Sequence, residues 1–76
     1  MDPFTIKLEV HQRSTYLSAR CADVPGLHIT GADLEDLRQR AMPAVKRLLL
    51  ANRHIDADIL PTDELTEFRV RPRSAA

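Results

Sequence analysis

The sequence predicts a small α+β domain, a two-layer sandwich in which one helix covers a small, mainly antiparallel sheet in the order β-β-β-α-β. Apolar residues alternate with a period of two toward both ends of the chain, an apolar stripe of helical spacing fills the middle, and turn residues separate these patterns. At 76 residues the chain is a single domain, residues 1–76. We expect an ordered core at about 4–71 and a tail at 72–76.

The first part of the chain has the alternation of three half-buried strands. Apolar side chains share one face in residues 4–10, a polar break follows at 11–14, and alternation resumes at 15–21 and again at 27–30. We expect the apolar positions to face the helix and the polar ones to face solvent. The outward positions of the later strands are Tyr16, Ser18, Arg20, His28 and Thr30.

Turn and cap residues lie between the third strand and the helix. The run Asp23-Val24-Pro25-Gly26 predicts a turn in which proline fixes φ and glycine supplies a positive φ. Gly31 closes the third strand, and Asp33 has the side chain of a helix N-cap. The expected structural turn and cap residues are therefore Asp23, Pro25, Gly26, Gly31 and Asp33.

The predicted helix runs from Asp33 to Asn52, where asparagine is a plausible C-cap. Leu50 is an exception to its pattern, because it falls on the polar side. Pro43 removes an amide inside the helix at a cost of about 3 kcal/mol, and it either kinks the helix or splits it. We favour a kink because the apolar stripe keeps its phase through the proline. The stripe comprises Leu34, Leu37, Ala41, Ala44, Val45, Leu48 and Leu49.

Residues 53–64 are rich in acids and are expected to form a loop, and residues 65–71 are expected to form the last strand. Arg69, Arg71 and Arg73 alternate along it and share one face, so they form a basic stripe that predicts nucleic-acid binding as an alternative function. We favour an edge strand that is protected by its charges, because the stripe has no stacking platform and the tract ends in a proline. An acidic protein patch is a second possible partner for the stripe.

Composition excludes several classes of protein. The 43% hydrophobic content excludes a disordered chain. The 11 basic residues balance the 11 acidic ones, which argues against a generic nucleic-acid or membrane binder. The first residues lack the pattern of a secretory signal, and the single cysteine forms no internal disulfide. We therefore expect a soluble cytoplasmic protein with a reduced thiol.

The sequence shows little that indicates catalysis. The histidines and Cys21 stand alone in different elements, without metal-ligand spacing, and the 2 glycines form no phosphate-binding loop. Cys21 falls on the inner face, where a packed thiol is expected. No catalytic, metal or cofactor-binding residue is therefore assigned and the chain is not expected to be an enzyme, although a small ligand-binding protein or degenerate enzyme stays as a third hypothesis.

A contact surface is the alternative to a catalytic site. Apolar burial contributes on the order of 110 kcal/mol, which is close to the cost of ordering the chain at ~1.5 kcal/mol per residue. Such a marginal domain favours a homo-oligomer, most simply a dimer, or a tight partner. The expected partner-binding residues are Tyr16, Arg20, His28 and Leu50.

The residues around the turn carry a resemblance to the HicB-like antitoxin family. The features in common are an aromatic residue in the second strand, the Asp-x-Pro-Gly turn, and the glycine and leucine-glutamate pair at the start of the helix. The later run 42–52, with Pro43 before a leucine-rich helix end, looks like a short subgroup of that family. The matching residues are Asp23, Pro25, Gly26, Gly31, Leu34 and Glu35.

This resemblance implies the fold already inferred, oligomer formation, and capture of a small basic toxin that cleaves mRNA. The antitoxin would mask the active surface of the toxin sterically and would carry no catalytic residue. Family members use a separate C-terminal segment to bind DNA, and this chain is expected to lack that segment.

Overall fold

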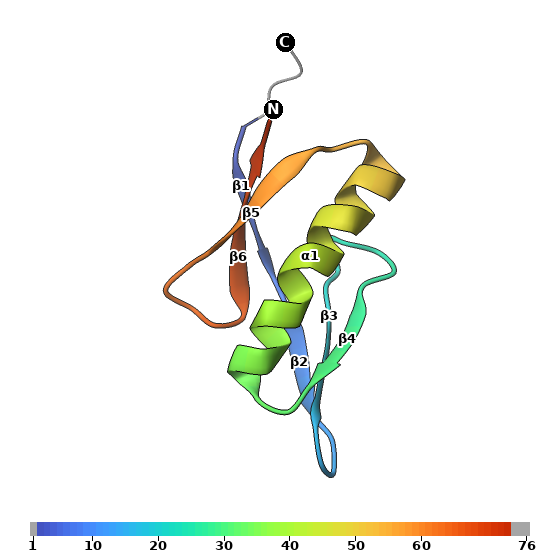
Figure 1. Cartoon of the computed structure of the whole chain (residues 1–76), viewed down its shortest axis with the longest axis vertical. Coiled ribbons are helices and arrows are strands. Elements are labelled where there is room, and N and C mark those ends of the chain that lie inside the picture. Colours follow the sequence, from blue (N-terminus) through green and yellow to red (C-terminus); the bar gives the residue numbers. More distant parts are fainter. Residues whose placement is uncertain (1, 74–76) are drawn as a thin grey trace.

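The computed structural model describes residues 2–73, which form a helix and six strands of the α+β class, as the sequence predicted (Figure 1). The strands make two antiparallel sheets, in the orders β1–β6–β5 and β2–β3–β4. The elements are β1 (Phe4–Lys7), β2 (Glu9–Gln12), β3 (Leu17–Arg20), β4 (His28–Gly31), α1 (Leu34–Arg53), β5 (Ala57–Pro61) and β6 (Glu67–Pro72).

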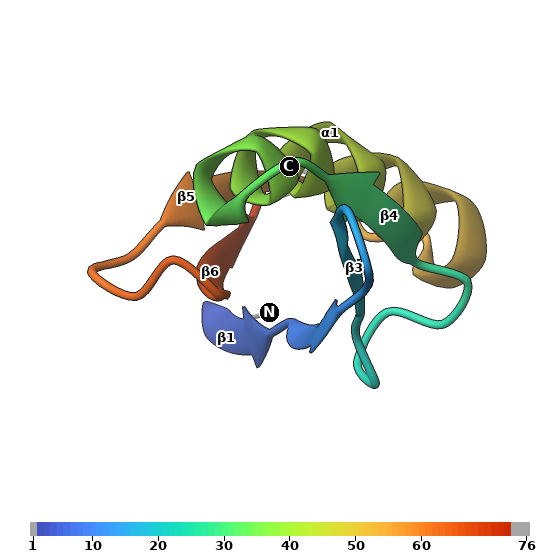
Figure 2. The same ribbon diagram turned by 90° about the horizontal axis from the view of Figure 1, so that it is seen from below.

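One continuous stretch, residues 4–12, supplies a strand to each sheet. The two strands are separated by Leu8, whose N–H donates to the carbonyl of Thr66 at 2.7 Å. β1 pairs with β6 before Leu8, and β2 pairs with β3 after it. The single strand predicted at 4–10 is therefore divided between two sheets, and both curve around the same face of α1 (Figure 2).

The core lies between α1 and the inner faces of the two sheets, where the predicted alternation is confirmed. Residues 4–12 contribute the buried side chains of Ile6 and Leu8 to this core, and β6 contributes those of Phe68 and Val70. Leu34 departs from the predicted stripe, because it is the first residue of the helix and is 37% exposed. The helix buries Leu37, Ala41, Val45 and Leu49.

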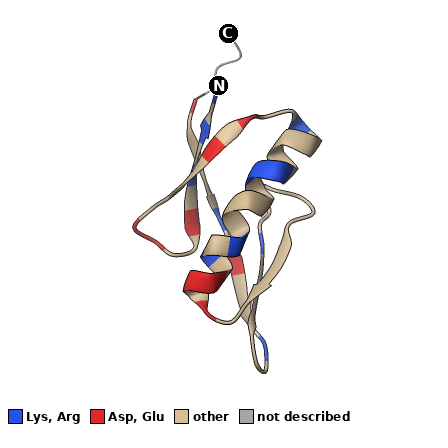
Figure 3. Cartoon of the chain, viewed as in Figure 1, with Lys and Arg blue, Asp and Glu red and all other residues tan. Residues whose placement is uncertain are grey.

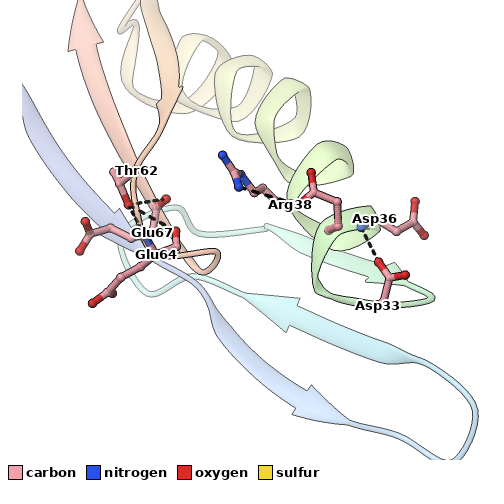
Figure 4. A network of polar contacts seen from close by, with 7 residues as sticks. Asp33, Asp36, Arg38, Thr62, Glu64 and Glu67 are labelled. Carbon is pink, nitrogen blue, oxygen red and sulfur yellow. Dashed lines mark hydrogen bonds and ion pairs between the residues drawn. The ribbon is translucent and has the colours of Figure 1, made fainter.

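The predicted N-cap of α1 is confirmed. The Asp33 carboxylate accepts a hydrogen bond from the N–H of Asp36 at 2.8 Å (Figure 4), which satisfies an amide that the first turn leaves without a partner. The Asp36 carboxylate accepts a second bond from the N–H of Ala32, before the helix, at 2.9 Å. The bonds from Ala32 and from Arg40 also lower the pKa of the Asp36 carboxyl.

The predicted C-cap is wrong, because the helix continues past Asn52. His54 takes the left-handed conformation at φ 56°, and the N–H of Ile55 then donates back to the carbonyl of Leu49 at 3.1 Å. The Asn52 side chain donates instead to the carbonyl of Pro25 at 3.4 Å. This bond ties the end of α1 to the turn before β4.

Pro43 does not split the helix, as α1 runs through it without interruption. Both Pro43 and Gln39 are exposed. The Gln39 carbonyl, which loses its usual amide partner at Pro43, therefore faces a side of the helix that water can reach.

β5 occupies part of the expected 53–64 loop, so that expectation is wrong over 57–61. Ala57 and Ile59 are buried in the core. This short alternation was not recognised in the sequence, because the neighbouring acids Asp56 and Asp58 are typical of a loop. Pro61 ends an edge strand, where a missing amide is tolerated.

The end of the chain is ordered further than expected. Pro72 pairs with Ala57, and the N–H of Arg73 donates to the carbonyl of Asp56 at 2.8 Å. The first two residues of the tail predicted at 72–76 therefore follow the β5–β6 pairing. The last three, 74–76, lie outside the described residues.

The turn before β4 has the predicted geometry. The N–H of Val24 donates to the carbonyl of Cys21 at 3.2 Å, and the N–H of Leu27 donates to the carbonyl of Val24 at 3.1 Å. Gly26 has φ 90°, which glycine adopts without strain. Asp23 is exposed on this turn.

Gly31 ends β4 where the sheet meets the first turn of α1. A Cβ atom at this position would lie 2.8 Å from the amide nitrogen of Leu37. Glycine therefore sets how closely the helix approaches the β2–β3–β4 sheet.

Candidate functional site

A hollow of about 310 Å³ lies on the β2–β3–β4 sheet, on the face turned away from the buried inner residues. It is open to solvent, and polar side chains predominate in its lining. The lining residues are His11, Arg13, Ser18, Ala19, Arg20 and His28.

The strand register brings these residues together. His11 on β2 is directly opposite Ser18 on β3, and Arg20 on β3 is directly opposite His28 on β4. Neighbouring strands are about 4.8 Å apart, and residues two apart along β3 are separated by about 7 Å. The two cross-strand pairs therefore form adjacent rows within one small patch.

Arg13 reaches this patch from the β2–β3 hairpin, which projects beyond the N-terminal end of α1 (Figure 1 and Figure 3). The N–H of Arg13 donates to the carbonyl of Tyr16 at 2.8 Å and closes the loop Ser14-Thr15. Its guanidinium Nε then donates to the Ser18 hydroxyl at 3.2 Å. The Ser18 side chain is buried at 4% exposure, so this bond both satisfies the hydroxyl and holds Arg13 back over the sheet.

Positive charge dominates the hollow. The Arg20 guanidinium lies 3.5 Å from the Glu9 carboxylate, and both side chains are largely exposed. An exposed pair of this length is weak and is readily exchanged for another partner. Arg13 has a neutral partner, the Ser18 hydroxyl. The hollow therefore has the chemistry of an anion site.

The structure brings together only part of the predicted contact surface. Arg20 and His28 line the hollow, while Tyr16 precedes β3 beside it and is 42% exposed. Leu50 is also exposed, at 52%, but it lies on the solvent face of α1, away from the sheets. Leu50 therefore does not belong to the same surface as the other three.

His11 and Arg13 were missed in the sequence, because both residues were assigned to the polar break at 11–14. β2 extends through Gln12, and the hairpin loop is confined to Ser14-Thr15. A shorter loop would have placed His11 opposite Ser18 by antiparallel register alone. That register was the available signal.

The arginine stripe on β6 is largely engaged within the chain. Arg71 and Arg73 lie 3.6 and 2.7 Å from the Asp58 carboxylate on β5. The hydrogen bond from Arg73 lowers the pKa of the Asp58 carboxyl, and the charges of Arg73 and Arg71 lower it further. Among residues 2–73, Arg69 is the member of the stripe that makes no ion pair.

Figure 4 shows a further polar network, which has a structural role. The Thr62 hydroxyl accepts from the N–H of Glu64 at 3.2 Å and lies 3.3 Å from the carbonyl of Glu67. These contacts order the β5–β6 loop. The same view shows an ion pair within α1, in which Arg38 lies 3.8 Å from Glu35.

Cys21 is a packed thiol, as predicted. It is buried, and burial raises the pKa of its thiol, which keeps it protonated and weakly nucleophilic. Among the residues the structure describes, no group of three or more His, Cys, Asp or Glu is placed to hold a metal ion. Within the same residues, no helix has both the length and the apolar character needed to cross a membrane.

Comparison with protein-family models, with curated proteins and with solved structures finds no match to this chain. The HicB-like resemblance therefore stays a prediction, and the functional argument depends on the geometry of the hollow.

Proposed function

We propose that this chain is a non-catalytic interaction module that holds a macromolecular partner against the outer face of the β2–β3–β4 sheet. The observation that carries this proposal is the basic hollow, in which Arg13 and Arg20 present charged donors from an open sheet face. Cationic side chains on an exposed face suit recognition of a complementary charged surface. They do not by themselves provide a nucleophile with a neighbouring base.

The shape of the molecule supports this proposal. The principal extents are 46 × 25 × 16 Å. Along its thinnest direction the molecule is therefore little thicker than one helix packed on one sheet. The exposed area is 5031 Å², compared with roughly 4,700 Å² expected for this mass. A thin domain has a large surface relative to the size of its core. A partner that binds to the outer face of the sheet would therefore also stabilise the fold.

The charge of the hollow narrows the class of partner. Like charges repel, so a basic toxin of the kind that the HicB-like resemblance implies is mismatched to this face. The same repulsion opposes a symmetric dimer in which two copies of the hollow meet. An acidic protein is the partner that the face fits, and antitoxin action or homodimer formation would need a different surface.

Co-expression with the protein encoded beside this chain tests the proposal. We expect a co-purifying complex that Arg20→Ala and His28→Ala each weaken, while Arg69→Ala, an exposed arginine on the other sheet, leaves it intact. Light scattering of the isolated chain measures any homodimer separately.

Three results would contradict the proposal. One is a neighbouring protein that does not co-purify. Another is a complex that is indifferent to Arg20 and His28. The third is relief of toxin-induced growth arrest by the Arg20→Ala variant at full strength, which would instead support an antitoxin acting through another face.

A further inference from the structure

We propose that the hollow is a binding site for a phosphate monoester, presented by a phosphorylated side chain of the protein partner. This inference rests on the proposed function and assigns the chemical group that the partner offers. It follows from the charge of the hollow, the directions from which its donors converge, and its size.

The charge of the hollow suits a dianion. Arg13 and Arg20 each contribute a guanidinium cation, the side-chain group best suited to bind phosphate. Glu9 is the carboxylate that pairs at the rim, and it faces Arg20 at 3.5 Å. A phosphate monoester carries about −1.5 to −2 charges at neutral pH, so it can replace Glu9 as the partner of Arg20 and engage Arg13 as well.

The donors converge from several strands. His11 comes from β2, Arg20 from β3 and His28 from β4, while Arg13 folds over them from the hairpin. A carboxylate has two oxygens in one plane and fits a single guanidinium fork. A phosphate monoester has three acceptor oxygens that point in different directions. Donors that come from three strands and a hairpin therefore suit a phosphate monoester better than a carboxylate.

Arg13 is oriented before a ligand arrives. The Ser18 hydroxyl accepts from Arg13 Nε at 3.2 Å, which leaves the terminal nitrogens of that guanidinium available. A donor held in place in advance loses less conformational entropy on binding.

The size of the hollow fits a phosphate together with the group that carries it. Its volume of about 310 Å³ is at the lower end of the range of about 300–1,000 Å³ for small-molecule sites. A phosphorylated side chain would place its phosphate among the arginines and fill more of this space than a single inorganic ion.

A titration of the full chain, followed by amide chemical shifts, tests the proposal. The ligands are phosphoserine, inorganic phosphate and succinate, each at constant ionic strength. We expect saturable shifts for phosphoserine at His11, Ser18, Arg20 and His28, weaker binding of inorganic phosphate, and the weakest binding of succinate.

Variants locate the site. Arg13→Ala and Arg20→Ala should each weaken phosphoserine binding about tenfold, since each removes hydrogen bonds to a charged group. Arg69→Ala is the matched control and should leave the affinity unchanged. Glu9→Gln should tighten binding by about twofold to fivefold, because it removes the competing carboxylate. An increase in affinity is a result that partial unfolding would not produce.

Several outcomes would overturn the proposal. Shifts that do not saturate, equal losses in Arg69→Ala, or equal binding of succinate would each show that the hollow does not select phosphate. A 12-nucleotide RNA without terminal phosphates that binds this face more tightly than phosphoserine, with strong salt dependence, would instead indicate a nucleic-acid surface.

The inference and the proposed function can fail separately. If the co-purified complex depends on Arg20 but survives phosphatase treatment, the interaction face stands and the phosphate site is wrong. If phosphoserine binds while no complex depends on Arg20 and His28, the site stands and the proposed function is wrong.

Discussion

The β1–β6–β5 and β2–β3–β4 sheets share one stretch of chain but differ in how their outward charges are matched. On the first sheet, Lys7 lies 3.6 Å from Glu64, and Asp58 binds both Arg71 and Arg73. On the second sheet, Arg20 has a weak carboxylate partner and Arg13 has a hydroxyl. The first sheet therefore satisfies most of its charges internally, whereas the second leaves positive charge available for a ligand.

The two sheets also differ in how deeply the side chains on their inner faces are buried. Phe68, Ile6 and Val70 are almost fully buried in the first sheet, while Leu17 and Ile29 are only partly buried in the second. The largest fully buried strand side chains are thus concentrated in β1–β6–β5. The comparison teaches that one sheet mainly supports the fold and the other mainly presents a surface.

Loss of the largest core side chain tests this difference most severely. Phe68→Ala should cost about 3–5 kcal/mol of unfolding free energy through lost burial and a cavity, and Ile29→Ala should cost less because Ile29 is partly exposed. Urea denaturation followed by circular dichroism measures both, and Phe68→Leu provides a milder probe if Phe68→Ala does not fold. Equal costs at the two positions would end the comparison.

The contact between the second sheet and the helix gives the next largest effect. Gly31→Ala should cost about 1–3 kcal/mol, because the new Cβ would meet the Leu37 backbone. Gly26→Ala is the control, since its Cβ would have room at 3.8 Å from Leu48 and only the positive φ is strained. Urea midpoints of the two variants separate steric overlap from backbone strain, and a harmless Gly31→Ala would disprove the close packing.

A pH series sharpens the account of the first sheet. The pKa of the Asp58 carboxyl is lowered by Arg73 and Arg71 in the folded state, so its charge stabilises the fold above the ordinary carboxyl pKa of 3.8 and loses this effect as the pH falls through the lowered value. Asp58→Asn should therefore have a lower Tm than the unaltered chain at pH 7, and the gap should narrow as the pH falls below 3.8 and through the lowered pKa. A gap that does not change with pH would exclude the charge as its cause.

The smallest effect is expected on the surface that we assign to binding. Arg20→Ala should change the unfolding free energy by no more than about 0.5 kcal/mol, as is usual for exposed side chains. Arg13→Ala should cost more, about 1 kcal/mol, because it leaves the buried Ser18 hydroxyl without its donor. Thermal unfolding of both variants checks this order, and a large loss of stability in Arg20→Ala would mean that Arg20 supports the fold.

The sequence identified about half of the hollow. Arg20 and His28 were predicted because outward positions on a strand follow from alternation within a few residues. His11 and Arg13 were missed because their place depends on where the hairpin turns. Leu50 was correctly predicted to be exposed but was assigned to the wrong surface, since exposure does not reveal which exposed residues are neighbours.

The sequence alone determined the helix, its N-cap at Asp33 and the turn at Gly26, because their hydrogen bonds and dihedral preferences act between residues a few positions apart. Only the tertiary structure decided the division of residues 4–12 between two sheets, the existence of β5 and the assembly of the hollow. Leu8 bonds to Thr66, and Ile6 pairs with Phe68, so the division depends on partners from the other end of the chain. The hollow depends on the register of β2, β3 and β4. Such pairings are selected by how the whole core packs, which no local pattern records.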